Sequence, residues 1–238
     1  MSGIALGSTQ IYGGKVKLGA GDISKVYAGG VQVWPAAPQV AVVDNWQFYS
    51  PDGAAGFPKS KSFNFGPASA GRIIVACIST QDGDPCYVEN VTIGGVTATI
   101  LAKASIANRI AMGIFAAVVP AGTSGVISWY AYSWKDDRPD ANTVDVFALS
   151  NGTLAGASGG AFSPGAATPA NYTTIGFAGV WGGSVISNWA APFVIGPVHA
   201  PQGYTTTAYL DTGAASNIHI NLSAGQDVHY LRAQFPRA

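Results

Sequence analysis

The sequence predicts an all-β protein in which a small amino-terminal module precedes a larger β-sandwich domain. Its 31 glycines and 14 prolines are spread along the chain, as in proteins with many turns between short strands. Between them lie short runs that either alternate apolar and polar residues or are apolar throughout, and both are strand patterns. No long run has a helical period with capping residues. We therefore expect antiparallel sheets throughout.

The segment 23–35 predicts a tight hairpin. Two short β-type runs flank the pair Gly29-Gly30. Glycine adopts the positive φ of a two-residue hairpin turn at little steric cost. Pro35 ends the second strand, because proline has no N–H group for a further ladder bond.

The same pattern occurs twice upstream of this hairpin. Segment 11–18 is similar to segment 26–33, and segment 4–11 is a looser copy. We predict that residues 1–35 form a β-hairpin or meander module, and that residues 36–238 form the sandwich.

A sheet as small as the amino-terminal module cannot build a full core. We expect the module to dock on a neighbouring protein, with Tyr27 and Trp34 as anchors. The alternative is that it folds back onto its own sandwich.

The larger domain is predicted to hold about ten strands at the spacing of a two-sheet sandwich, most simply a jelly roll. The run that follows Arg72 is apolar through Ser79, as in a strand covered on both faces. Residues 151–171 are expected to form a long loop or weak edge strand, and residues 181–201 an excursion over the sandwich. The expected strands are 62–66, 72–79, 88–93, 96–100, 110–119, 125–134, 143–149, 172–180, 204–210, 217–222 and 228–235.

Charge excludes some classes of partner. Twelve basic residues balance twelve acidic ones, and charged residues make up only 10% of the chain, against roughly 25% in typical domains. A nucleic-acid-binding protein needs a clustered basic face, so we expect neither nucleic acid nor an anionic membrane surface as partner. A protein of near-zero net charge tends to associate unless its surface is covered, which fits a subunit of an assembly.

The ends and the two cysteines indicate a protein made in the cytosol. The amino terminus has no basic region followed by an apolar core, and no run of about 18 apolar residues is present, so we expect no signal peptide and no membrane insertion. Cys77 lies in an apolar run and Cys86 follows a loop. A disulfide between them is an alternative, but a reduced pair is the better prediction for a cytosolic product.

No set of residues predicts an enzyme. The single glutamate, Glu89, leaves no carboxylate pair for glycoside hydrolysis. His199, His219 and His229 are dispersed and predict structural roles rather than a zinc site. We therefore expect no catalytic residue, no metal and no cofactor.

Two acidic segments are candidate cation sites. Segment 135–145 and segment 81–85 each concentrate oxygen ligands, but neither has the spacing of a calcium loop. We predict solvated loops at both.

Tyr130, Tyr132 and Trp134 alternate along one predicted strand, so their side chains are expected on one face. Three interpretations remain open: a sandwich core, a subunit interface, and a platform on which a host sugar stacks. Aromatic side chains suit an interface because they bring a large area at a low entropic cost.

Several short sequence motifs, taken in their order along the chain, resemble a β-sandwich domain of accessory virion proteins of tailed phages and gene transfer agents. The segment 23–35 is similar to a short module that recurs at the front of such phage proteins. The motifs in the larger domain begin at Gly71, Val91, Met112 and Val144. The resemblance covers roughly residues 4–35 and 60–151.

The resemblance implies a structural virion protein, such as a head spike, a fibre or a minor tail protein. We expect a non-enzymatic homo-oligomer that is assembled in the bacterial host cytoplasm and displayed on the virion. Its partners would be other virion proteins and copies of itself, and it would mediate assembly or host attachment. The alternative is a carbohydrate-recognising module that binds a host cell-surface glycan.

Overall fold

The computed structural model divides the chain into two compact units, Met1–Ala37 and Pro38–Arg237. This boundary lies close to the predicted one at residue 35. The structure describes residues 4–6, 9–11, 16–18, 21–23, 26–28, 31–34, 40–49, 60–82, 84–106, 109–133, 141–150, 153–163, 165–169, 172–181, 186–189, 193–199, 203–210, 216–217, 220–222 and 228–236.

The amino-terminal unit contains three short hairpins. Their strand pairs are β1 (Ile4–Leu6) with β2 (Thr9–Ile11), β3 (Val16–Leu18) with β4 (Gly21–Ile23), and β5 (Val26–Ala28) with β6 (Val31–Trp34). The pairing of Ala28 with Val31 confirms the predicted hairpin around Gly29-Gly30.

The repeat predicted at residues 11–18 is wrong. Ile11 ends one hairpin, and β3 pairs forward with β4, with Leu18 opposite Gly21. The reason is that Leu18 and Gly21 pair with only two residues between them in the sequence, which is the spacing of a tight hairpin. The true repeat is an octad that starts at residues 4, 16 and 26, with glycine in its fourth position.

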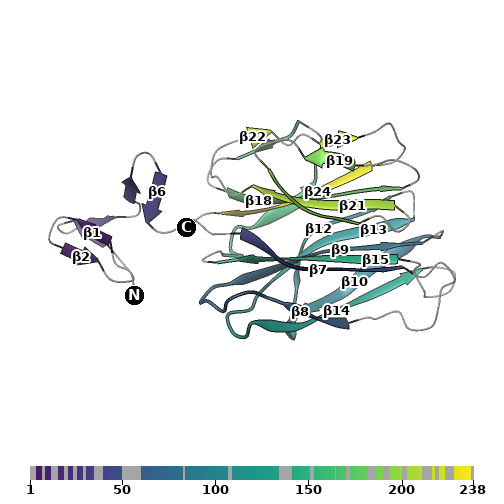
Figure 1. Cartoon of the computed structure of the whole chain (residues 1–238), viewed down its shortest axis with the longest axis horizontal. Helices are drawn as coiled ribbons and strands as arrows, with labels where there is room; N and C mark the ends of the chain where they lie inside the picture. Colours follow the sequence, from purple (N-terminus) through teal and green to yellow (C-terminus); the bar gives the residue numbers. More distant parts are fainter. Residues whose placement is uncertain are drawn as a thin grey trace. The chain divides into compact units, whose positions relative to one another are not determined.

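All-β architecture is confirmed in the larger unit, which is built from antiparallel sheets stacked in layers (Figure 1). The central sheet has the strand order β12-β13-β9-β15-β7. Its strands are β12 (Thr99–Ile106), β13 (Ile110–Val118), β9 (Ile73–Gln81), β15 (Ala141–Leu149) and β7 (Val40–Tyr49).

A second sheet covers one face of the central sheet, and the two form the first sandwich. Its order is β11-β10-β14-β8. Its strands are β11 (Val96–Thr97), β10 (Cys86–Ile93), β14 (Ser124–Ser133) and β8 (Ser60–Asn64). The apolar core between these sheets includes Phe63, Ile74, Phe115, Trp129 and Val146.

The opposite face of the central sheet packs against a third, C-terminal sheet of order β16-β24-β18-β21-β20. Alternate residues of the central strands, such as Ile73, Val75 and Phe147, enter this second core. This explains why β9 is apolar from Ile73 to Ile78: it is buried on both faces. The third sheet contains β16 (Ser158–Ala161), β24 (Val228–Pro236), β18 (Tyr172–Trp181), β21 (Gly203–Leu210) and β20 (Val194–His199).

Four short strands cover the outer face of the C-terminal sheet. Trp189 packs there so closely that a Cβ on Gly176 would lie 2.4 Å from its ring. Arg232 on β24 donates a hydrogen bond of 2.8 Å to the carbonyl of Ala167. These covering strands are paired as β17 (Ala167–Thr168) with β22 (Ser216–Asn217), and β19 (Ile186–Trp189) with β23 (Ile220–Leu222).

The predicted antiparallel β-sandwich is thus confirmed, and the larger unit contains two sandwiches in tandem with one topology instead of a single pair of sheets. If β7, β8, β9, β10, β12, β13 and β15 are matched in order with β16, β17, β18, β19, β20, β21 and β24, the two five-stranded sheets have the same strand order. The long strand β14 pairs with β8 and then with β10; its counterparts β22 and β23 pair with β17 and β19. The jelly-roll topology is a finer statement and stays a prediction.

Candidate functional site

Three tyrosines form a cluster on the first sandwich. Tyr87 of β10 lies opposite Tyr132 of β14, and their rings stack with centroids 4.8 Å apart and planes 20° apart. Tyr130 continues the row, with its ring centroid 5.2 Å from that of Tyr132. We call these three residues the tyrosine cluster.

The cluster lies on the outer face of its sheet, away from the core. Along β14, Ile127, Trp129 and Ala131 are buried, whereas Tyr130 and Tyr132 are half-buried. The core interpretation of these two tyrosines is therefore wrong, because the alternation of the strand turns them to the solvent side. Tyr87, the third ring, is 41% exposed.

A distortion of β10 accompanies the cluster. The register with β14 shifts between Glu89 and Thr92, and Asn90 within this bulge has a φ of 49°. Bulges re-aim side chains and are frequent beside functional sites. Glu89, opposite Tyr130, also lies 4.0 Å from the ammonium group of Lys103 on β12.

The fold does not require aromatic residues at this place. In the second sandwich, β19 and β23 are the counterparts of β10 and β14, and their register sets Asn188 opposite Asn221. The corresponding ladder thus forms without a pair of tyrosines. The tyrosine cluster is a property of this sandwich and not of the topology.

Three other predicted residues are placed less fully. Trp134 lies outside the described residues. Tyr27 and Trp34 belong to β5 and β6, but the described structure of those strands covers their pairing and not these side chains.

A second polar group, buried between the central and C-terminal sheets, was not predicted. Asp145 on β15 is 1% exposed. Its Oδ1 accepts a hydrogen bond of 2.7 Å from Nε2 of His199 on β20, and its Oδ2 accepts one of 2.8 Å from the hydroxyl of Thr207 on β21. Nδ1 of His199 lies 3.1 Å from Oε1 of Gln47 on β7.

This arrangement joins the central sheet to the C-terminal sheet, and both ring nitrogens of His199 are engaged in it. The prediction that Asp145 belongs to a solvated acidic loop is wrong, because this residue lies in the middle of β15. The pair was missed because 54 residues separate its members, and only the stacking of the sheets joins them.

The two thiols are buried and separate. Cys77 belongs to the core between the central and C-terminal sheets, whereas Cys86 belongs to the core of the first sandwich. Both are free, and the central sheet lies between them. Burial raises the pKa of Cys86 to about 12. Burial, followed by the nearby carboxylate of Asp145, also raises the pKa of Cys77.

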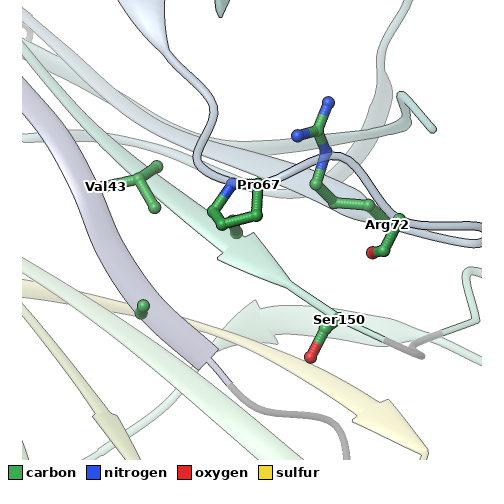
Figure 2. Close-up of a pocket in the computed structure, with 7 residues that line it drawn as sticks. Val43, Pro67, Arg72 and Ser150 are labelled. Carbon is green, nitrogen blue, oxygen red and sulfur yellow. The ribbon is translucent and has the colours of Figure 1, made fainter. Parts of the chain in front are cut away.

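One pocket of about 270 Å³ lies at the end of the first sandwich (Figure 2). Val43, Pro67, Arg72 and Ser150 are among its lining residues. The guanidinium group of Arg72 donates all of its hydrogen bonds to backbone carbonyls. The pocket thus offers an apolar wall and no free charged group from Arg72.

Neither a metal site nor a membrane-spanning helix occurs in the part of the chain that the structure describes. Among those residues, no group of three or more histidine, cysteine, aspartate or glutamate side chains could hold a metal ion. His219 and residues 135–140 lie outside this part of the chain. The described residues include no helix that is long and apolar enough to cross a membrane.

Comparison with known proteins found no family model, no curated protein and no solved structure that matches this chain.

Proposed function

We propose that the chain is a structural, non-enzymatic component of a tailed phage or phage-like particle. In this proposal it is displayed on the head or tail, as a spike, fibre or minor tail protein, and mediates assembly or host attachment. The motifs that resemble accessory virion proteins, including the front module, support this role. The single observation that carries the binding function is the tyrosine cluster.

The geometry of the cluster favours contact with another protein. The rings of Tyr87 and Tyr130 both contact the ring of Tyr132, so the three rings form one continuous aromatic group. A rigid group of aromatic rings with hydroxyl tips suits a protein interface, where one end of each side chain is apolar and the other is polar. Other virion proteins or copies of the chain are the proposed partners.

The first test is to analyse purified particles from the strain that encodes the chain. We expect the protein in intact particles by mass spectrometry, and an image reconstruction of the particle should contain its layered body. A chain that is absent from the particles and remains in the cell lysate would refute the proposal.

A second test uses matched tyrosine variants. Tyr87→Ser with Tyr132→Ser should lower incorporation into particles, or attachment of the particles to host cells, by about tenfold or more, because interface hot spots are worth at least about 2 kcal/mol. Tyr49→Ser is the control, since Tyr49 is 46% exposed on β7 and lies outside the cluster. Equal effects of both changes would show that the cluster has no special role.

The alternative function is recognition of a host glycan. The exposed ring of Tyr87 is the place where a sugar ring could stack. A glycan array separates the two functions: specific binding that is lost with Tyr87→Ser or Trp134→Ala, but kept with Tyr49→Ser, would favour the carbohydrate module.

A further inference from the structure

The interface between the central and C-terminal sheets brings together equivalent strands from its two sides, although β12 makes a more extensive contact than its counterpart β20. The matching of strands given above defines pairs of counterparts in the two five-stranded sheets. They are β12 and β20, β7 and β16, β13 and β21, β9 and β18, and β15 and β24. The contact of β12 with β16 then corresponds to that of β20 with β7, and the contact of β12 with β24 to that of β20 with β15.

The remaining contacts follow the same rule. The contact of β13 with β18 corresponds to that of β21 with β9. The contact of β13 with β24 corresponds to that of β21 with β15, where the hydroxyls of Thr143 and Thr205 lie 3.2 Å apart. An interface that maps onto itself when its partners are exchanged is isologous, and such a surface can also pair with its own copy.

Symmetry alone would therefore allow three pairings: the first sandwich with the second, two first sandwiches from different chains, or two second sandwiches. In a particle subunit present at high local concentration, two first sandwiches or two second sandwiches from different chains could associate. Such like pairs would compete with correct folding. Something in the interface must favour the unlike pair.

The buried pair of Asp145 and His199 breaks the symmetry. In a pair of first sandwiches, Asp145 would face β12 and β13, whose residues at this interface are apolar. They are Ala102, Ala104, Ile110, Met112, Ile114 and Ala116. In a pair of second sandwiches, His199 would face β24, which contributes Leu231, Ala233 and Phe235. Each like pair thus buries a polar or charged group without its partner, which is strongly unfavourable.

We propose that the larger unit is a covalently linked pseudo-dimer of two sandwiches, and that the Asp145–His199 pair is the specificity determinant that selects unlike over like pairing. Gln47 and Thr207 contribute to this selection. Gln47 lies within hydrogen-bond distance of the second nitrogen of the imidazole, and Thr207 donates to the second oxygen of the carboxylate. The second sandwich of the same chain is therefore the partner that covers the second face of the central sheet.

The test starts from the full chain with a protease site inserted between Ala155 and Gly156, which are both exposed in the connection from β15 to β16. Each sandwich takes all its strands from its own side of this cut. The cleaved protein is unfolded in urea, refolded and analysed by native mass spectrometry. We expect only the unlike pair of fragments from the wild-type sequence.

Asp145→Leu combined with His199→Leu and Thr207→Val removes the determinant together with the buried hydroxyl that donates to Asp145. We expect this cleaved variant to form like pairs of the first fragment, with a share that approaches statistical pairing. The matched control is Ser79→Ala combined with Thr205→Val, which removes neutral hydroxyls from the same interface. It should give the unlike pair alone.

If the apolar variant does not refold, Asp145→Asn with His199→Gln removes the imidazole–carboxylate pair with smaller changes of shape and should also yield like pairs. Like pairs from the wild-type sequence would overturn the proposal, as would unlike pairs alone from every variant that refolds. The readout does not involve particles, so it is independent of the proposed virion role.

Discussion

Arg72 shows how one residue holds several backbone segments. It is 1% exposed, and its Nε donates to the carbonyl of Val119. Its terminal nitrogens donate to four further carbonyls, those of Phe65, Gly66, Ala121 and Gly122. The five donors of the guanidinium group are therefore all used, and the loops after β8 and β13 are tied to the start of β9.

Replacing Arg72 should destabilise the protein strongly. Arg72→Met would leave buried carbonyls without donors, and we expect the free energy of unfolding to fall by about 3 kcal/mol or more. Urea denaturation measures this loss. Arg232→Met is the control, since Arg232 makes one exposed bond, and it should cost less than about 1 kcal/mol.

The cysteines should be inert in the folded protein. Because burial raises the pKa of both thiols, neither Cys77 nor Cys86 should react with a thiol reagent at neutral pH until the protein unfolds. Absorbance with a chromogenic disulfide reagent, with and without urea, measures this. Reaction of either thiol in the native protein would contradict the buried placement.

The same shifts predict loss of stability in alkali. In the unfolded chain a thiol loses its proton near the ordinary cysteine pKa of 9.0, whereas in the folded protein Cys86 keeps its proton up to about pH 12. The contribution of this thiol to stability is therefore complete below pH 9 and falls between pH 9 and 12, because the unfolded state releases its proton first. Denaturation midpoints across this range should fall less in Cys86→Ala than in the wild type.

At the scale of elements, the bulge in β10 and the close contact over β18 are local features that packing imposes. Asn90 is the non-glycine residue with positive φ in the described part of the chain. Gly176 leaves space for the ring of Trp189, which is 3% exposed and belongs to the core outside the C-terminal sheet.

The bulge can be tested through its backbone. Asn90→Val should lower the free energy of unfolding by about 1–2 kcal/mol, because a β-branched residue is strained at positive φ. Asn90→Gly should be neutral or slightly stabilising. If valine and glycine have equal effects on the melting temperature, the strained conformation is not present in solution.

At the scale of the whole molecule, the layers depend on one another, but all three described cores lie within residues 40–235. Removing residues 151–238 would expose the second apolar face of the central sheet, with Asp145 among its residues. We expect this truncated chain to aggregate when it is expressed alone.

Deleting residues 1–35 should have the opposite outcome for folding. The melting temperature of the larger unit should change by no more than about 2 °C, because residues 40–235 supply three apolar cores of their own. Incorporation into particles should nevertheless fall if the module docks on a neighbouring protein, and normal incorporation would refute docking.

The sequence by itself determined the all-β class, the Gly29-Gly30 hairpin and the placing of most strands, because turn residues and alternation act locally. It also marked Tyr130 and Tyr132 as sharing a face. It did not separate β12 from β11, since the chain changes sheets at Ala98 within one β-type run.

Only the tertiary structure decided the number of layers, the face on which the tyrosines lie, and the pairing of Asp145 with His199. The apolar run in β9 indicated burial on both faces, but it did not show that a third sheet covers the second face. The two sandwiches have the same topology because their strands pair in the same order. Many different sequences can form the same strand order, so the sequence did not show this repeat. Pairing across layers joins residues far apart in the chain, and no local pattern records it.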